Sequence, residues 1–457
     1  MAALLGGAAC YSPQINECSI QCGSGGSCPS GTTCLADNFC HGSQATLCSG
    51  LPDGPIGMPD ARPGTPDSPP GTPDAPRRAD APVGTPDSPP GTPDAPTAAD
   101  APTAADAPTA ADAPTPCVPI LEPVDTTGSP QMGDISIDTA GTLHATYVRS
   151  DTNELWYARK AVGGDWSLEM VDDATPVKKG QFIDPFNAIH VAYSFTNLGT
   201  TTLRYARRAP DTGVWTAQDV TSDGDAIDAS IVVDALGTVH IAYYDNDHGE
   251  LDHASRSLIA NGWSFETVDN VGNVGEYPSL AISPTNQRLV VSYHDVLLDE
   301  LKLAQRINGH WMADTLDTSL NVGSFTALAI DSLGNFHIAY ANDNVGSLRY
   351  ILVDHTGGMP LRLPADTGKT GHWNAIGVDP KGGVHISTYA YGTADLHVAF
   401  RAGPTSSFAA APVDTDGNVG RFTGIAVDAQ GGSHVVYTDD THAELKHAFV
   451  CPPSTSP

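Results

Sequence analysis

The sequence has 457 residues, a length that accommodates two or three domains. Its 53 Asp and Glu residues outnumber 22 Lys and Arg residues, so the formal net charge is -31. This balance excludes nucleic acids and anionic membrane surfaces as partners, because both are bound through clustered cations. No apolar run approaches the ~20 residues of a membrane-spanning helix.

The first ten residues, MAALLGGAAC, are apolar and end in small residues before Cys10. They resemble the last part of a bacterial lipoprotein signal, in which small residues precede a lipidated cysteine. The resemblance implies lipidation at Cys10 and an outer-membrane anchor, through which alone the chain would contact a membrane. The alternative is the remnant of an ordinary secretory signal. Both predict export to the extracellular space or the cell surface.

Cysteine usage also indicates export. Residues 11–50 are rich in glycine and poor in apolar residues, and they contain six of the nine cysteines: Cys18, Cys22, Cys28, Cys34, Cys40 and Cys48. Such a segment cannot bury a sufficient core, so we expect a module held by three disulfides, whose pairing the sequence leaves open. Zinc is the alternative, but the CxxC pairs of zinc ribbons are absent.

Residues 51–116 have the composition of a linker. The phrase GTPDSPPGTPDAP begins at positions 64 and 84, and TAADAP occurs three times between 97 and 114. Proline interrupts helices and sheet ladders, and neighbouring aspartates repel one another. The sequence therefore predicts a disordered, extended stalk with much polyproline II structure.

Residues 117–451 contain seven copies of one phrase, spaced 46 to 50 residues apart. The copies read IDTAGTLHATY, IDPFNAIHVAY, VDALGTVHIAY, ISPTNQRLVVSY, IDSLGNFHIAY, VDPKGGVHIST and VDAQGGSHVVY. Each period holds four short runs rich in Val, Ile and aromatic residues, separated by Gly, Asp and Asn turns, and helical periodicity is absent. Four strands per period, seven times, predict an all-β domain: a seven-bladed β-propeller of four-stranded blades.

The seventh copy is one strand short, because the domain ends soon after ELKHAFVC and leaves only a tail at 452–457. The missing strand matches PILEPVD, residues 119–125, so we expect the N-terminal end of the domain to complete the last blade. Aligned on an intact blade, Cys117 and Cys451 fall on either side of one hairpin turn. We therefore predict a disulfide between them.

The repeated phrase carries a histidine in six of its seven copies, with Val290 in the remaining one: His144, His190, His240, His337, His385 and His434. Catalysis requires a histidine at one site, whereas copies spread around a ring cannot act together. We interpret them as buried structural residues, hydrogen-bonded to the backbone or to a neighbouring blade. The repeated Asp and Gly are expected to shape the turn.

The phrase resembles the Asp-box, or BNR, repeat of sialidase-like propellers and, more loosely, the NHL repeat, over residues 125–450. The serine and tryptophan of the Asp-box are missing here. The resemblance implies a propeller and the handling of glycans. It does not identify an enzyme.

Function is expected where the copies differ. The segments between blades read DNVGNVGEY, DTSLNVGSF, DTGKTGHW and DTDGNVGRF; the residue after the last glycine varies, and an aromatic residue follows it. These segments and the loops between second and third strands form the face on which propellers usually bind ligands. From this face we select nine candidate ligand-binding residues: Tyr244, Asp245, Glu276, Tyr277, His294, His372, Trp373, Tyr389 and Arg421.

Carboxylates, aromatic rings and histidines around a shallow funnel favour sugar binding by stacking and hydrogen bonds, although a solvated acidic rim is the alternative for each residue. We therefore expect a monomeric binding or scaffold module for a glycan or protein ligand, with no catalytic residue assigned. No cofactor or metal site is expected, although the aspartates of YDNDHGE could hold Ca2+.

The alternative function is a polysaccharide-active enzyme, either sialidase-like or a lyase. A sialidase needs three arginines on the ligand-binding face, and only Arg149 and Arg421 fall there. A lyase needs a base beside a cation, which His294, His372, Tyr244 and Arg421 could supply. The sequence does not place these residues together.

Overall fold

The computed structural model describes residues 33–34, 40–41, 117–173, 176–197, 200–221, 225–257, 262–355 and 359–451. In the N-terminal unit, β1 (Thr33–Cys34) pairs with β2 (Cys40–His41) as a two-stranded sheet. The predictions for the lipidated Cys10, the disulfide pairing within 11–50, the linker at 51–116 and the tail at 452–457 lie outside the described residues.

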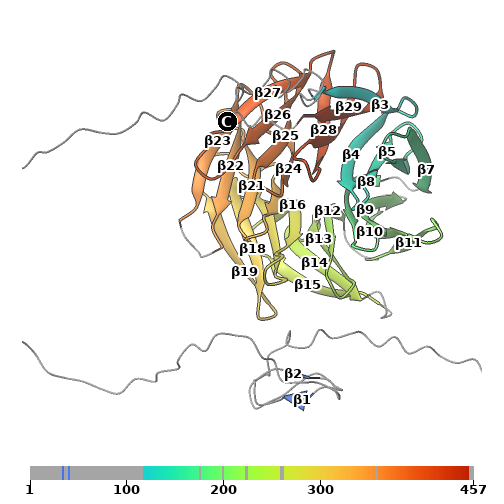
Figure 1. Cartoon of the computed structure of the whole chain (residues 1–457). Helices are drawn as coiled ribbons and strands as arrows, with labels where there is room; N and C mark the ends of the chain where they lie inside the picture. Colours follow the sequence, from blue (N-terminus) through green and yellow to red (C-terminus); the bar gives the residue numbers. More distant parts are fainter. Residues whose placement is uncertain are drawn as a thin grey trace, which may run out of the picture. The chain divides into compact units, whose positions relative to one another are not determined.

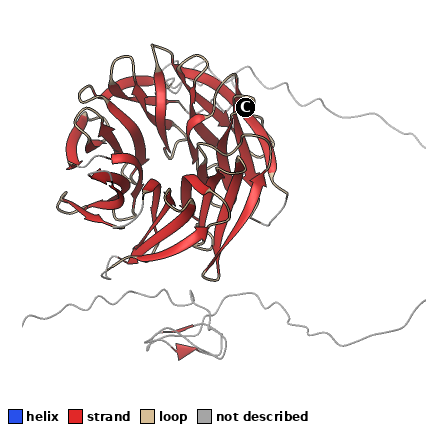
Figure 2. Ribbon diagram, turned by 180° about the vertical axis from the view of Figure 1, so that it is seen from behind, coloured by secondary structure: helices blue, strands red, loops and turns tan. Residues whose placement is uncertain are grey.

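Strands β3 to β30 form seven four-stranded antiparallel sheets, arranged around a ring in Figure 1. In six of the sheets the four strands follow one another in the chain, from the inner strand to the outer one. In the seventh sheet β28, β29 and β30 are followed by β3, which is the outer strand. This is the predicted seven-bladed propeller. Within the described residues no helix occurs, as the ribbon view shows (Figure 2). The described part of the chain therefore has no helix of the length and apolar character that crossing a bilayer demands.

The first four blades hold β4 to β19. Blade 1 contains β4 (Pro130–Ile137), β5 (Leu143–Arg149), β6 (Glu154–Lys160) and β7 (Trp166–Asp172). Blade 2 contains β8 (Pro176–Ile183), β9 (Ile189–Asn197), β10 (Thr200–Arg208) and β11 (Trp215–Asp219). Blade 3 contains β12 (Ala226–Val233), β13 (Thr238–Asp245), β14 (Glu250–Ser257) and β15 (Ser264–Asp269). Blade 4 contains β16 (Val274–Ile282), β17 (Leu289–Asp295), β18 (Glu300–Ile307) and β19 (His310–Asp317).

The last three blades hold β20 to β30 and β3. Blade 5 contains β20 (Ala327–Ile330), β21 (Phe336–Asn342), β22 (Ser347–Val353) and β23 (Leu361–Thr367). Blade 6 contains β24 (His372–Val378), β25 (Val384–Ala390), β26 (Asp395–Arg401) and β27 (Ala409–Asp414). Blade 7 contains β28 (Val419–Val427), β29 (Ser433–Asp439), β30 (Glu444–Val450) and β3 (Ile120–Asp125).

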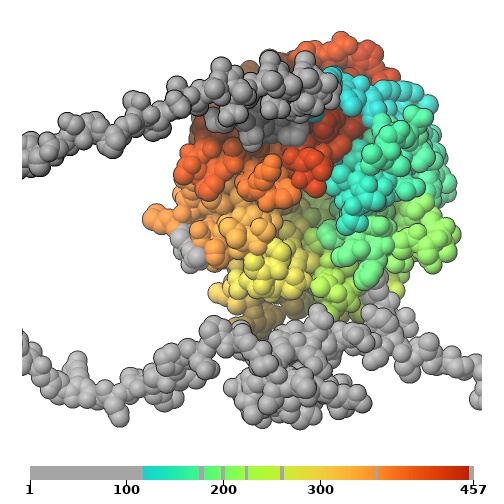
Figure 3. Space-filling view, viewed as in Figure 1, coloured from blue at the N-terminus to red at the C-terminus, as the bar shows by residue number. Residues whose placement is uncertain are grey.

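The ring closes through blade 7, as predicted. β3 pairs antiparallel with β30, so Leu121 lies opposite Ala448. In the space-filling view the cyan N-terminal strands meet the red C-terminal ones (Figure 3). Cys117 and Cys451 form the expected disulfide, with a Cα–Cα separation of 5.8 Å. The first and last strands of the domain are therefore joined covalently as well as by sheet hydrogen bonds.

Side chains alternate along each middle strand, so the two faces of the strand pack against two different neighbouring blades. β21 is buried along its whole length. Phe336 and Tyr340 pack in one cluster with Leu301 of the preceding blade. Ala339, on the other face, packs in a cluster with Ile386 of the following blade. Strands in the middle of a blade therefore read as nearly continuous apolar runs, because neither face meets water.

The repeated histidine belongs to a three-residue brace inside its blade, here called the Asp–His–Tyr brace. In blade 5, Asp331 Oδ1 accepts backbone hydrogen bonds from Leu333 and Asn335, which shapes the turn. His337 Nε2 lies 3.2 Å from Asp331 Oδ2, and its Nδ1 lies 2.7 Å from the Tyr350 hydroxyl. A carboxylate only accepts, so Nε2 carries the proton and Nδ1 accepts from the tyrosine.

Corresponding sets occupy five other blades: Asp138–His144–Tyr157, Asp184–His190–Tyr205, Asp234–His240–His253, Asp379–His385–Ser433 and Asp428–His434–His447. In blade 4 the same positions hold Ser283, Val290 and Leu303. The structural reading of the histidines is confirmed. The partners of the rings are mostly side chains of the same blade, and of the six imidazoles that of His385 alone hydrogen-bonds to a side chain of a neighbouring blade, Ser433.

A second repeated contact joins each blade to the next near the segments between blades. Asp317 at the end of β19 accepts a 2.7 Å hydrogen bond from the Tyr340 hydroxyl of blade 5 and a backbone hydrogen bond from Ser319. The same pairing occurs in Asp172–Tyr193, Asp269–Tyr293 and Asp414–Tyr437. This contact accounts for the aspartate that ends the outer strand in these four blades.

Candidate functional site at the mouth of the central channel

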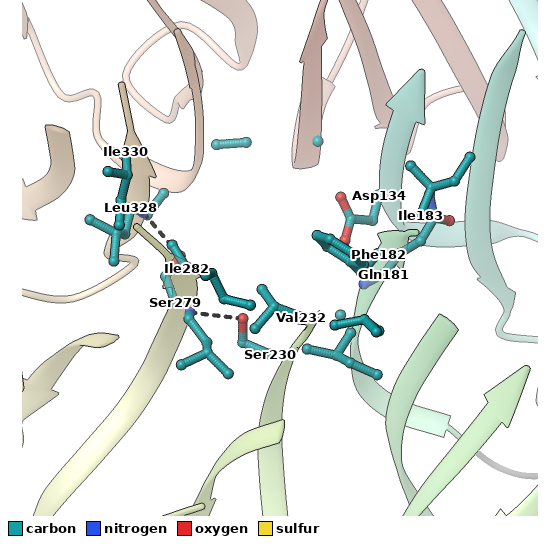
Figure 4. Close-up of a pocket in the computed structure, with 18 of the residues that line it drawn as sticks. Asp134, Gln181, Phe182, Ile183, Ser230, Val232, Ser279, Ile282, Leu328 and Ile330 are labelled. Atoms are coloured by element: carbon teal, nitrogen blue, oxygen red, sulfur yellow. Dashed lines mark hydrogen bonds between the residues drawn. The ribbon is translucent and has the colours of Figure 1, made fainter. Parts of the chain in front are cut away.

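A channel runs along the axis of the propeller, with a volume of about 970 Å³. The inner strands of all seven blades line it. In Figure 4 the polar side chains on its wall bridge neighbouring blades. Ser230 Oγ accepts from the Leu280 backbone at 3.0 Å, and Ser279 Oγ accepts from Leu328 at 2.9 Å. These polar groups hold the ring together.

A smaller cavity of about 210 Å³ lies where the inner strands begin, and it shares lining residues such as Thr326 with the channel. We call this end, which carries the segments between blades, the upper face. Asp138 and Asp234, which begin the turns after the inner strands, line the opposite end of the channel. The small cavity is therefore the upper mouth of the channel.

Near the start of the inner strand, blades 1 and 3 to 7 each turn one side chain into this mouth, and in all of these except blade 5 the position is a bulge. The pairing register slips between Glu276 and Ser279 in blade 4, and at corresponding points in other blades. The residue at the bulge has a positive φ, which is 53° for Tyr277 and 48° for Trp373. Bulky residues rarely adopt this conformation, and each instance costs on the order of 1–3 kcal/mol. The backbone is therefore locally strained at the positions from which these side chains point into the mouth.

Four consecutive blades place an aromatic residue at this position: Tyr277, Phe325, Trp373 and Phe422. We call these four side chains the aromatic arc. The distance between ring centroids is 4.6 Å for Tyr277 and Phe325, 5.4 Å for Phe325 and Trp373, and 5.0 Å for Trp373 and Phe422. The arc forms one continuous wall of the mouth, across blades 4 to 7.

The other wall contains Met132 of blade 1 and Asp228 of blade 3 at the same bulge position. Asp228 is buried, and its Oδ2 accepts a hydrogen bond from the Tyr277 backbone at 3.3 Å. The mouth thus combines an apolar wall with a carboxylate. The bulge does not itself require an aromatic residue, since Met132 and Asp228 also occupy it.

Arg421 lies against the arc. Its guanidinium carbon is 4.7 Å from the centroid of Trp373 and 4.9 Å from that of Phe422. Its Nη1 also donates to Asp440 Oδ2 at 2.9 Å. The aromatic faces therefore already accommodate one cation, whose charge a carboxylate balances.

His372 lies next to Phe325, with ring centroids 4.7 Å apart, and it stacks on Tyr391 at 4.3 Å. Its Nε2 is 2.8 Å from Asp343 Oδ1, and Asp343 Oδ2 accepts from Ser324 at 2.6 Å. The hydrogen bond with His372 is the main reason why the pKa of Asp343 lies below its usual value. In this order the carboxylate lies between the serine and the histidine, so Ser324 bonds to Asp343 and not to the imidazole.

Glu276 and His294 face each other beside Tyr277. His294 Nδ1 lies 3.7 Å from Glu276, and its Nε2 lies 3.7 Å from Asp299, which is too far for a hydrogen bond in either case. The His294 ring is 6.4 Å from the Tyr277 ring. The candidate residues of blades 4, 6 and 7 therefore gather around the arc.

The remaining candidates take part in the scaffold. The Tyr244 hydroxyl donates to Asn273 at 2.7 Å, and the Tyr389 hydroxyl donates to Asn418 at 2.7 Å, so both brace segments between blades. The Tyr389 ring still packs 5.5 Å from Trp373. The Asp245 carboxylate stabilises the turn after β13 by accepting hydrogen bonds from the backbone N–H groups of Asp247 and His248.

Metal binding and sialidase chemistry find little support in the side chains that the structure describes. No group of three or more potential metal ligands occurs among them, and Asp245, from the stretch proposed for Ca2+, is used within its turn. Arg149 forms a 2.8 Å ion pair with Asp125 and lies 3.5 Å over Trp156. It is therefore engaged in joining blade 1 to blade 7.

Sequence reasoning selected two members of the arc and omitted Phe325 and Phe422. The signal for both was present, since an aromatic residue follows the variable residue in four copies. Asp228 and Met132 carried no such signal, because the segments before them lack the sequence of glycine, variable residue and aromatic residue that the other four share. Only the structure shows that they occupy the same bulge.

No protein-family model and no curated protein matches this sequence. Several solved structures resemble the fold at low identity. The Hadza microbial sialidase Hz136 is 10% identical with a TM-score of 0.43, over 70% of this chain and 65% of that chain. The polysaccharide lyase Uly1 is 10% identical with a TM-score of 0.48, over 69% and 89%. A PL25 ulvan lyase bound to -[GlcA(1-4)Rha3S]- is 11% identical with a TM-score of 0.49, over 69% and 90%. This chain thus spans about two thirds of the sialidase's length, and the likeness is one of fold.

Proposed function

We propose that the protein is an extracellular carbohydrate-binding module, whose ligand stacks on the aromatic arc at the upper mouth of the channel. The observation that supports this is the presence of four aromatic side chains at positions of positive φ around the mouth, in four consecutive blades. Packing of the ring alone does not account for them, because other blades use Met132 and Asp228 there. Aromatic faces beside a few polar groups are typical of sugar sites.

The size of the mouth limits what enters it. A cavity of about 210 Å³ is smaller than the roughly 300–1,000 Å³ of sites for drug-sized ligands. One sugar ring is therefore the unit that we expect to enter, with further units of a longer glycan lying over the upper face. The proposal favours a terminal residue or a side branch.

The disulfide supports the proposed extracellular location. The bond between Cys117 and Cys451 fits an oxidising environment, where disulfides form and persist. Export to the cell surface, with Cys10 as the lipidated anchor, remains part of this proposal. An extracellular glycan is then available to the upper face.

The first prediction tests the arc with an array of glycans and the full-length protein. Trp373→Ala should weaken binding of any positive glycan by roughly tenfold, equivalent to ~1.4 kcal/mol, because a stacking face is lost. Trp311→Ala is the matched control: this tryptophan is half-buried on β19, outside the mouth, and donates to Glu266. Equal affinities for the two variants would contradict the proposal.

A polysaccharide lyase is the second candidate, favoured by one observation. His372 and Arg421 both contact Trp373, with a 5.8 Å centroid distance for the former, so a base and a cation flank one stacking surface. Incubation with uronate polysaccharides, followed by ultraviolet absorbance of the unsaturated product, tests it. If the protein formed this product and the His372→Ala variant did not, the protein would be a lyase and not a binding module.

A further inference from the structure

We infer that the aromatic arc is selective for a cationic sugar, a hexosamine whose amino group is free and protonated. This inference rests on the proposed function and names the class of ligand for the same site. It excludes sialic acids and uronates, the anionic sugars on which the alternative sialidase-like and lyase functions would act. Three independent features of the mouth support it.

The first feature is the chemistry of the wall. Aromatic faces attract cations, because the ring quadrupole places negative charge on the face. The arc already does so with its own side chain, since the Arg421 guanidinium lies within 5 Å of the centroids of Trp373 and Phe422. Tyr277 and Phe325 continue the same surface toward Asp228, on the side away from Arg421.

The second feature is the charge around Tyr277. Burial raises the pKa of the Tyr277 hydroxyl, and the negative charges of Glu276, Asp228 and Asp343 raise it further. A field that opposes an anion at this point favours a cation there for the same reason. Asp228 lines the cavity itself, so it can contact an ammonium group directly.

The third feature is the balance of charge around the arc. Among the side chains that the structure describes, two basic ones contact the arc and each pairs with a carboxylate: Arg421 with Asp440, and His372 with Asp343. They therefore offer little free positive charge to a uronate or a sialic acid. The formal net charge of -31 acts in the same direction at longer range, because it concentrates cations near the surface.

The polar lining of the mouth fits a sugar. Thr326, Asn374 and Thr423 line both the small cavity and the channel. The Thr326 hydroxyl donates to Ser292, the Thr423 hydroxyl contacts Ser387, and Asn374 Nδ2 donates to backbone carbonyls, so these groups have partners within the fold. The lone pairs that remain on the threonine oxygens can accept hydrogen bonds from the ring hydroxyls of a hexosamine.

The second prediction compares two ligands that differ only at nitrogen. Full-length protein is titrated by calorimetry with a glucosamine oligomer and with the matched N-acetylglucosamine oligomer. We expect the free amine to bind roughly tenfold more tightly, and the preference to shrink as salt is added. Asp228→Asn should reduce the preference without unfolding the protein, because asparagine tolerates the positive φ of 55° at this position.

Asp211→Asn makes the same change of charge on an exposed turn outside the mouth and should keep the preference. Equal or tighter binding of the acetylated oligomer, or of a uronate oligomer, would overturn the inference and leave the carbohydrate-binding module in place. A trimethyl-lysine peptide that binds while every glycan fails would overturn both.

Discussion

At the scale of single residues, the recurrent histidine is understood by what surrounds it. His337 is 4% exposed, and both of its ring nitrogens have partners in the Asp–His–Tyr brace. Burial lowers its pKa, so the neutral form is the one that the fold contains. Blade 4 shows that the brace can be replaced as a whole, because Val290 and Leu303 remove the imidazole and its hydroxyl partner together.

The third prediction is that His337→Ala lowers stability by ~1–3 kcal/mol, since Tyr350 and Asp331 lose a buried partner. It should leave glycan binding unchanged. A histidine with a lowered pKa gives stability that is complete above its ordinary value of 6.5 and is lost as the pH falls below it. Thermal unfolding between pH 7 and 5 should therefore depend less on pH in the variant.

Val290→Ala is the matched control for this prediction, because it occupies the same position in blade 4 and carries no proton. It should lower the melting temperature and keep the pH dependence of the unsubstituted protein. If His337→Ala melted normally but no longer bound the glycan, the histidine would belong to the site.

At the scale of elements, the strands were predictable and the bulges were not. Repetition and two-residue alternation gave the blades, and the missing seventh-blade strand gave β3 and the bond between Cys117 and Cys451. The bulge leaves no comparable trace, because one extra residue in an inner strand does not alter the apolar pattern of the repeat. For this reason Tyr277 and Trp373 were selected as aromatic residues that follow a variable residue, while Asp228 was missed.

The partners of individual side chains were equally hidden from the sequence. Tyr244 and Asp245 stood on the correct face, but hydrogen bonds to Asn273 and to the backbone engage them in the scaffold. Such contacts depend on how neighbouring blades approach each other. A single sequence reports the residue types at a face and not the distances between them.

The fourth prediction concerns the packing of inner strands against each other. A Cβ atom on Gly424 would lie 2.8 Å from the Asp134 backbone of blade 1. Gly424→Ala must therefore shift β28 away from β4, and we expect a loss of ~1–3 kcal/mol in thermal unfolding. Gly403→Ala, where nothing lies within 4 Å, should change stability by less than ~0.5 kcal/mol. Equal melting of the two variants would show that the inner strands are not in close contact.

At the scale of the whole molecule, stability depends on closure. Each blade buries both faces against its neighbours, so a ring opened at one blade exposes two apolar faces at once. Blade 7 is the point of weakness, because its outer strand comes from the other end of the domain. The disulfide lies beside this strand and closes a loop with a sequence separation of 334 residues.

The fifth prediction is that the Cys117→Ser, Cys451→Ser double variant melts earlier, by an amount equivalent to ~2–5 kcal/mol. The fold should persist at low temperature, since six blades contain only their own consecutive strands. Addition of a reductant to the unsubstituted protein should reproduce the shift. A variant that melts like its parent would show that sheet pairing alone closes the ring.

The closure by β3 also sets an order in time. Residues 120–125 are synthesised first and must wait for 444–450 before they can pair, a delay of roughly 15–65 s at ~5–20 residues per second. During that interval Cys117 coexists with the six cysteines between 18 and 48, whereas Cys451 does not yet exist. Thiol exchange takes place within seconds to hours, so early mispairing competes with the correct bond. We therefore expect a disulfide isomerase to raise the yield of the Cys117–Cys451 bond during biosynthesis without changing the stability of the finished fold.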